Sequence, residues 1–236
     1  MRSHMDQIKQ WGRNHPGLGP WLWAVGMVAY FTAQYIVALA WPYPFSLQRN
    51  AISDLANTSC SYRLHVCSPL HNLMNATLII VGIAMAIGAL CLLDAYKPTR
   101  PARISFTLLG LTGAATALIG FFPEDQNFLA HYLITAVGLT IFNFSVIIAY
   151  WVRELPSAWR RYSLAMGTVG LAALVALGLR RPTPLGLGGL ERVADYTPDI
   201  WVLTLSMYLI IKPDVIARKA TLSNQDKSLA LHPQKR

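Results

Sequence analysis

The sequence predicts an all-α membrane protein: a polytopic bundle of six transmembrane helices with both termini in the cytoplasm. Three observations support this prediction. First, 54% of the 236 residues are hydrophobic and only 13% are charged, whereas charged residues make up about 25% of a typical soluble domain. Second, the apolar residues gather in six runs, most of them near the roughly 20 residues that a helix needs to cross a bilayer. Third, the basic residues fall on alternate connections between these runs.

The six predicted spans form one membrane domain with short flanks. In order, they are Gly19–Trp41, Leu70–Leu93, Ile104–Phe122, Phe128–Trp151, Tyr162–Leu179 and Ile200–Ile211. The last run is short, and the stretch GGLERVADYTP before it is expected to add a turn or two. Residues 1–18 are expected to be a cytoplasmic segment that starts with a tag remnant at 1–4, and residues 19–211 are the membrane domain. Residues 212–236 are polar and basic, which predicts a disordered cytoplasmic tail.

Lysine and arginine lie mainly on one side of this arrangement. The N-terminal segment, the second and fourth connections and the C-terminal tail hold fourteen of them, against five on the other side, with Arg2 left out. Cytoplasmic segments of membrane proteins are enriched in lysine and arginine, so both termini are predicted to be cytoplasmic. The net charge of +9 is therefore a topology signal and a lipid-facing fringe. Nucleic-acid binding is not expected.

Polar residues converge on the opposite, outer side of the predicted bundle. They come from the first outer connection, the ends of the second, third and fourth helices, and the connection before the sixth. Ionisable groups near membrane depth usually face a bundle interior or a wet cavity and mark function, so we expect a shared pocket at the outer leaflet. The expected catalytic residues are His71, His131, Asp54, Glu124 and Glu191, and the expected substrate-binding residues are Asn50, Ser53, Asn72, Asn75 and Arg192.

Each of these residues also has a structural interpretation. Ser53–Asp54 can cap a short interfacial helix, His71 and His131 can be satisfied groups at helix ends, and Glu191 can pair with Arg192. The glycine-rich stretch before Glu191 has the wrong spacing for a dinucleotide fingerprint. It is interpreted as a flexible turn that lets the Glu191 segment fold back towards the bilayer. The convergence of separate segments on one side favours the pocket.

Two of the three cysteines lie in the first outer connection. Cys60 and Cys67 are seven positions apart, and in an oxidising compartment they can form a disulfide. We expect this pairing, with two free thiols as the alternative. Cys91 lies within the second predicted helix and is expected to be a small apolar residue.

Four stretches taken in order carry a resemblance to a known family. They are NAISDLANTSC, CSPLHNLMN, GFFPE followed by His131, and GLGGLERVADY. Together they resemble the domain-of-unknown-function 998 family of bacterial and archaeal integral membrane proteins, from the first helix to the sixth. The stretch YPFSLQRNAISDL has a looser likeness to the Frag1/DRAM membrane family. Membership of the former implies six helices and a membrane location, and it implies no activity.

The first functional hypothesis is a membrane-embedded enzyme, a hydrolase or transferase that acts on a lipid or lipid-linked substrate from the outer leaflet. His71 and His131 would be general base and acid, with Asp54 or Glu124 orienting an imidazole. Arg192 would hold a phosphate or carboxylate head group. The cofactor is open; in a metal-assisted version, His71, His131 and Asp54 would hold a divalent metal such as zinc.

The second hypothesis is non-catalytic: a lipid-binding protein or assembly factor, in which the same polar groups form a binding pocket or a structural network. A small-molecule transporter is less favoured, because no inverted repeat is visible. In each case the expected partner is membrane lipid and the expected location is the cell membrane, with the functional face extracytoplasmic. The substrate, the reaction and the oligomeric state stay open at this stage.

Overall fold

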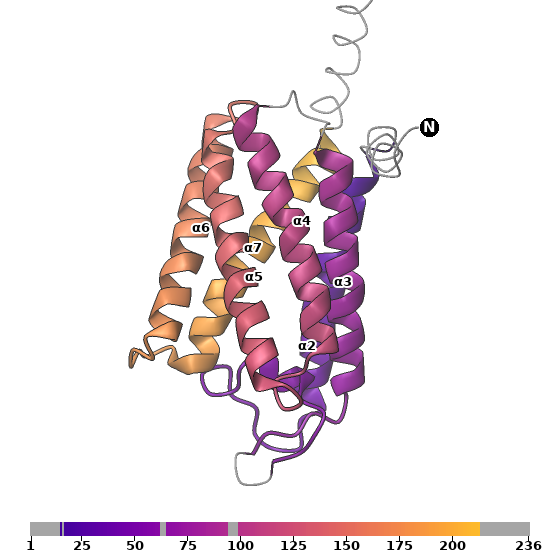
Figure 1. Cartoon of the computed structure of the whole chain (residues 1–236), viewed down its shortest axis with the longest axis vertical. Coiled ribbons are helices and arrows are strands. Elements are labelled where there is room, and N and C mark those ends of the chain that lie inside the picture. The colour runs from indigo at the N-terminus through magenta and orange to yellow at the C-terminus, as the bar shows by residue number, and fades with distance from the viewer. Residues whose placement is uncertain (1–14, 16, 62–64, 94–98, 213–236) are drawn as a thin grey trace, which may run out of the picture.

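Six long helices run side by side in the computed structural model, which describes residues 15, 17–61, 65–93 and 99–212 (Figure 1). Two short 3₁₀ helices, η1 and η2, join them. The expected tag remnant at 1–4, most of the N-terminal segment and the expected tail from residue 213 onward lie outside the described residues. The helices are α2 Leu18–Leu39, η1 Ser53–Ala56, α3 His71–Leu92, α4 Arg100–Phe121, α5 Phe128–Ile148, η2 Ala149–Trp151, α6 Ser157–Gly178 and α7 Gly186–Ile211.

Several helix starts are marked by proline. Pro101 lies in the first turn of α4, Pro20 lies in the first turn of α2, and Pro156 directly precedes α6. Backbone N–H groups in a first turn have no partner within the helix, so a residue without an N–H loses nothing there. α5 begins differently: the Asn127 side chain accepts a hydrogen bond from the Ala130 N–H, which satisfies one of those groups.

The helices form a closed ring. Each one packs against the next along the chain, and α7 completes the ring by packing against α2. Five of them, α2 to α6 with η2 extending α5, are long and apolar enough to cross a membrane. Large apolar side chains such as Val25, Ile80 and Leu118 remain exposed on the outside. A soluble monomer rarely exposes so much apolar surface, so the chain is a multi-pass membrane protein.

Close backbone approach brings α3 and α4 together. A Cβ atom added at Gly82 would overlap the Gly113 carbonyl oxygen and the backbone of Ala117, and one added at Gly113 would meet the Gly82 carbonyl in turn. Only glycine at both positions lets the two backbones lie this near, which is the usual packing device of membrane helices.

The start of the last helix differs from the prediction. The sixth run was placed at Ile200–Ile211 with a turn or two before it, but α7 begins at Gly186 and has 26 residues. The glycines interpreted as a flexible turn belong to its first turn. A Cβ at Gly188 would overlap the Asn50 carbonyl oxygen, so the glycine is there because another backbone crosses the helix. α7 is not among the five apolar spans, because Glu191, Arg192 and Asp195 lie in its first half and Asp199 lies near its middle.

The two ends of the bundle differ in what they carry. The connection at 40–70, the turn at 122–127 and the turn at 179–185 lie at one end, at the bottom of Figure 1, which we call the loop end. The start of α2 and the last turn of α7 lie at the other end. The predicted polar residues are therefore concentrated near one end of the bundle, with the connection at 40–70 covering it.

Candidate functional site

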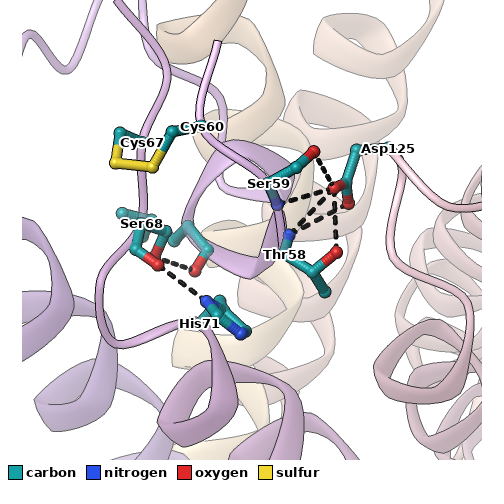
Figure 2. Close-up of a disulfide and its surroundings, with 8 residues drawn as sticks. Thr58, Ser59, Cys60, Cys67, Ser68, His71 and Asp125 are labelled. Carbon is teal, nitrogen blue, oxygen red and sulfur yellow. Dashed lines mark hydrogen bonds between the residues drawn. A yellow bond between two sulfur atoms is a disulfide. The ribbon is translucent and has the colours of Figure 1, made fainter.

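The connection at 40–70 is folded back on itself at the loop end. Cys60 and Cys67 are joined by a disulfide with an S–S distance of 2.01 Å, which confirms the predicted pairing (Figure 2). Ser61 and Val66 form an antiparallel β-bridge between them. The Ser68 hydroxyl donates to the Leu55 carbonyl at 2.7 Å. These contacts bring the chain after the disulfide back to η1, which packs on α2 and α3.

Asp125 ties the turn before α5 to this connection. Its carboxylate accepts hydrogen bonds from the backbone N–H and the hydroxyl of Thr58, at 3.0 and 2.9 Å, and from those of Ser59, at 2.8 and 2.6 Å (Figure 2). Partial burial opposes ionisation, but these donors outweigh it and lower the pKa of Asp125 below its ordinary value. The sequence had pointed to the neighbouring Glu124 instead.

Glu191 and Arg192 hold the same connection from consecutive positions on α7. The Glu191 carboxylate accepts from the backbone N–H groups of Ile52 and Ser53, at 3.0 and 3.3 Å. These N–H groups begin η1 and have no partner within it. Arg192 is buried, and its Nη1 donates to the carbonyls of Leu47 at 3.0 Å, Asn50 at 2.5 Å and Gly188 at 2.9 Å. Arg192 therefore binds loop backbone, where a head group had been expected.

A cavity of about 60 Å³ lies inside the bundle, bounded on one side by η1. α2, α3, α4, α5 and α7 supply the rest of its wall. The wall combines apolar side chains such as Leu78 and Phe142 with ionisable and hydroxyl groups. The polar lining residues are Tyr30, Ser53, Thr112, Thr116, His131, Thr135, Glu191 and Asp195. A polar cavity of this size has room for a few water molecules or a small substrate group.

His71 and His131 make the same kind of hydrogen bond to a backbone carbonyl, but only His131 lines the cavity. His131 Nδ1 is 2.8 Å from the Phe122 carbonyl, and His71 Nδ1 is 2.8 Å from the Ser68 carbonyl. Because a carbonyl oxygen only accepts, Nδ1 carries the hydrogen in both rings, and Nε2 is the acceptor when the ring is neutral. His131 is buried and lines the cavity. His71 is half-buried at the first turn of α3 and does not line it.

A second polar network lies against the cavity, between α2 and α7. The Tyr30 hydroxyl donates to Asp195 Oδ2 at 2.7 Å, and the Tyr196 hydroxyl donates to Gln34 Oε1 at 2.6 Å. Asp199 lies one turn after Asp195 on the same face of α7 and is buried. Acidic groups thus continue from the cavity wall into the interior of the bundle.

The expected pocket is assembled only in part. The cavity gathers Ser53, His131 and Glu191. The others lie outside its lining: Asn75 Nδ2 donates to the Ala56 carbonyl at 2.9 Å, Asn50 Oδ1 accepts from the Ser46 N–H at 3.0 Å, and Asn72 is exposed.

Asp54 folds back on its own loop, where Oδ2 accepts from the Ala51 N–H at 2.9 Å. Burial raises the pKa of Asp54, and the nearby charge of Glu124 adds to this effect. Among the described residues no three histidine, cysteine, aspartate or glutamate side chains gather where they could hold a metal ion. The expected set of His71, His131 and Asp54 is therefore not brought together.

The sequence also contained signals for residues that were given no role. Tyr30 and Gln34 are four apart on α2, and Asp195 and Asp199 are four apart on α7. Residues at this spacing share a helix face. A polar pair on one face of an apolar helix therefore points to a polar partner on a neighbouring helix. Because the Glu191 segment was interpreted as a loop, the polar pair on α7 was not recognised as the partner of the polar pair on α2.

The fold and the cavity define a class: a helical multi-pass membrane protein with a polar interior site covered by a disulfide-braced connection. A family model described as "Protein of unknown function (DUF998)" matches residues 24–208. The chain belongs to that family, as the four stretches had indicated. No curated protein and no solved structure matches the chain.

Proposed function

We propose that this protein is a membrane-embedded hydrolase or transferase of the cell membrane, whose reaction centre is the interior cavity. In this proposal all six helices span the bilayer, both termini are cytoplasmic and the loop end is extracytoplasmic. The observation that carries the proposal is the composition of the cavity wall, whose lining includes His131, Glu191, Asp195 and Ser53. General acid–base catalysis uses these groups.

His131 is the proposed general base. Its Nδ1 is committed to the Phe122 carbonyl, which fixes the ring orientation and leaves Nε2 as the atom able to take a proton. Asp195 and the hydroxyls on the wall are candidates for binding the substrate and returning the proton. Glu191 is a positioning residue, because its carboxylate already accepts the two N–H groups that start η1 and so fixes Ser53 at the cavity edge.

The proposed substrate is a lipid or lipid-linked molecule. The exterior of the helices is apolar, so a molecule that reaches the cavity from between the helices comes from the bilayer. The cavity volume of about 60 Å³ matches the small reacting part of such a molecule. The acyl chains would remain in the bilayer, outside the bundle.

The test is a comparison of lipid turnover. The purified protein is placed in nanodiscs made from extracted bacterial lipids, and the lipids are followed by mass spectrometry. Wild type should convert one lipid class, and His131→Gln should slow this by about 10²–10⁴-fold, the usual contribution of a general base. His65→Ala is the control, since His65 is exposed on the connection and lies outside the cavity. Equal turnover by wild type and His131→Gln would contradict the proposal.

A non-catalytic lipid-binding or assembly factor is the second candidate. It is favoured by the commitment of Arg192 to three backbone carbonyls, which makes this part of the network structural. In that case no lipid class is converted, and one class is retained by the purified protein at constant stoichiometry. The nanodisc experiment separates the two candidates, because it records both conversion and retention.

A further inference from the structure

α7 carries three acidic side chains near a single buried arginine, so the arginine cannot neutralise all of them. Glu191, Asp195 and Asp199 lie on one helix within nine residues, and Arg192 is the cation whose charge acts on Glu191 and Asp195. Asp199 is only 4% exposed and Arg192 only 7%. Three carboxylates beside one guanidinium would leave uncompensated negative charge away from water, which is strongly unfavourable.

The three acids differ in what holds them. Glu191 accepts two backbone N–H groups and has Arg192 next to it, an arrangement that suits a carboxylate ion. Asp195 accepts the Tyr30 hydroxyl at 2.7 Å. No N–H or O–H group within the described chain donates to Asp199 Oδ2, which is buried. Asp195 lies one turn before Asp199 on the same face of α7, so the two carboxyl groups are neighbours on the helix.

Contact between two carboxyl groups is favourable only when a proton lies between them. Two ionised oxygens repel, whereas one O–H and one O⁻ form a short charge-assisted hydrogen bond. A single additional proton supplies the missing donor at Asp199 Oδ2 and lowers the excess negative charge of this cluster from two to one. A second buried group is also without a partner: Gln34 Nε2, on the face of α2 that meets α7.

We propose that Asp195 and Asp199 form a buried proton-binding site, in which the two carboxyl groups share one proton and exchange it with the cavity through Asp195. Asp195 lines the cavity and Asp199 does not, so the pair connects the cavity with the bundle interior. Binding takes one proton from water in the cavity and forms an O–H···O⁻ bond between the two side chains. Release returns the proton by the same route.

The charged and polar groups around Asp195 and Asp199 determine the pH at which the pair releases its proton. α2 presents the Tyr30 hydroxyl, α5 presents His131 across the cavity, and α6 presents the uncharged Gly170 near Thr197. Among the residues that the structure describes, the other charged or titratable neighbours are on α7 itself: Glu191, Arg192 and Tyr196. This site does not depend on the proposed catalysis, since it would exist equally in a binding protein.

Infrared spectroscopy of the full chain in nanodiscs tests the proposal. At neutral pH, wild type should show the carbonyl stretch of one protonated carboxylic acid per chain, shifted by exchange into D₂O. Asp195→Asn and Asp199→Asn should each remove this band, because the new amide N–H supplies the hydrogen that the proton supplied. Asp125→Asn, which changes an exposed carboxyl group, and Glu191→Gln should both retain it.

Three results would overturn the proposal. Absence of the band in wild type means that no shared proton is held, and this result does not depend on any variant folding. A band that persists in both asparagine variants places the proton on another group. A band that does not shift on exchange into D₂O shows that the group giving rise to it does not exchange a proton with the cavity.

Discussion

Asn143 supplies a hydrogen bond that α7 lacks because of its internal proline. Pro198 lies inside α7 and has no N–H, so the carbonyl of Ala194 lacks its usual helical partner. The Asn143 side chain from α5, fully buried, donates to that oxygen at 3.0 Å and to the Leu139 carbonyl at 2.9 Å. An orphaned buried carbonyl costs about 1–3 kcal/mol, so this one side chain makes the proline tolerable in the polar half of α7.

The space around Asn143 gives a prediction at the scale of one residue. A Cβ atom at Gly170 of α6 would overlap Asn143 Oδ1 and Thr197 Oγ1. We expect Gly170→Ala to destabilise the protein by about 1–3 kcal/mol, the usual cost of overpacking. Thermal unfolding in detergent, followed by tryptophan fluorescence, should show Tm lower by roughly 2–4 °C for each kcal/mol.

Gly178→Ala, on the same helix, is the matched control. Nothing lies within 4 Å of a Cβ at that position, so we expect no loss of stability and, since alanine favours the helix, a gain of a few tenths of a kcal/mol. Equal effects of the two substitutions would contradict the packing described for Asn143.

Asp125 gives a prediction about pH. Its pKa is lower in the folded protein than the ordinary value of 3.8, so its ionised form stabilises the fold. This stabilisation is complete above the ordinary pKa and is lost as the pH falls through the folded pKa. Because Asp125 is exposed, solvent screening keeps the effect small. We expect wild type to have a higher Tm than Asp125→Asn at pH 7, and the difference to vanish in acid.

Glu124, the residue before Asp125, provides a control for the pH experiment. Glu124→Gln removes a charge from the same turn without touching the bonds to Thr58 and Ser59, so its difference from wild type should not follow this pH dependence. A Tm difference between wild type and Asp125→Asn that grows as the pH is lowered would be the wrong sign.

At the scale of elements, the connection at 40–70 depends on a short covalent ring. The Cys60–Cys67 disulfide closes a ring that begins directly after Thr58 and Ser59, the two residues that donate to Asp125. The chain-entropy account gives about 2–3 kcal/mol for a ring this small. We therefore expect reduction, or the double change to serine, to lower Tm by roughly 4–12 °C. Cys91→Ser is the contrasting variant, because it removes a buried thiol that forms no disulfide. Its Tm should fall on reduction by as much as that of wild type, whereas the Tm of the double serine variant should not respond to reductant.

How far the sequence predicted these elements depended on whether the signal was local. Apolar runs and prolines are local, and α2 to α6 lie close to where they were predicted. The disulfide also followed from local spacing. α7 was misplaced because its first half is polar, and its glycines have meaning only once the backbone at 47–50 crosses it. The candidate site was predicted in part for the same reason: His131 and Glu191 were recognised as polar groups, while Tyr30 lies 165 positions from Asp195, to which its hydroxyl donates.

At the scale of the whole molecule, the ring of helices determines at which end of the bundle the first turn of α2 and the last turn of α7 lie. The start of α2 and the end of α7 are at one end of the bundle, opposite the loop end (Figure 1). The excess of lysine and arginine in the segments of that end predicts that it is cytoplasmic. A reporter fused to the C-terminus should be active only as a cytoplasmic protein. Activity of an enzyme that works only outside the cytoplasm, fused at the same place, would reverse the orientation and move the cavity to the other side.

The hydrogen bonds of Glu191 and Arg192 with residues 47–53 join two parts of the chain that are synthesised at very different times. The contacts span between 138 and 145 positions in sequence. During synthesis, the connection at 40–70 leaves the ribosome long before α7 does. Until the last helix is inserted, the first N–H groups of η1 and the carbonyls of Leu47 and Asn50 have only water as a partner. The connection at 40–70 is therefore fixed over the cavity only after α7 is inserted. A chain that stops before α7 lacks the cavity-lining residues of that helix and also the side chains that hold the connection in place.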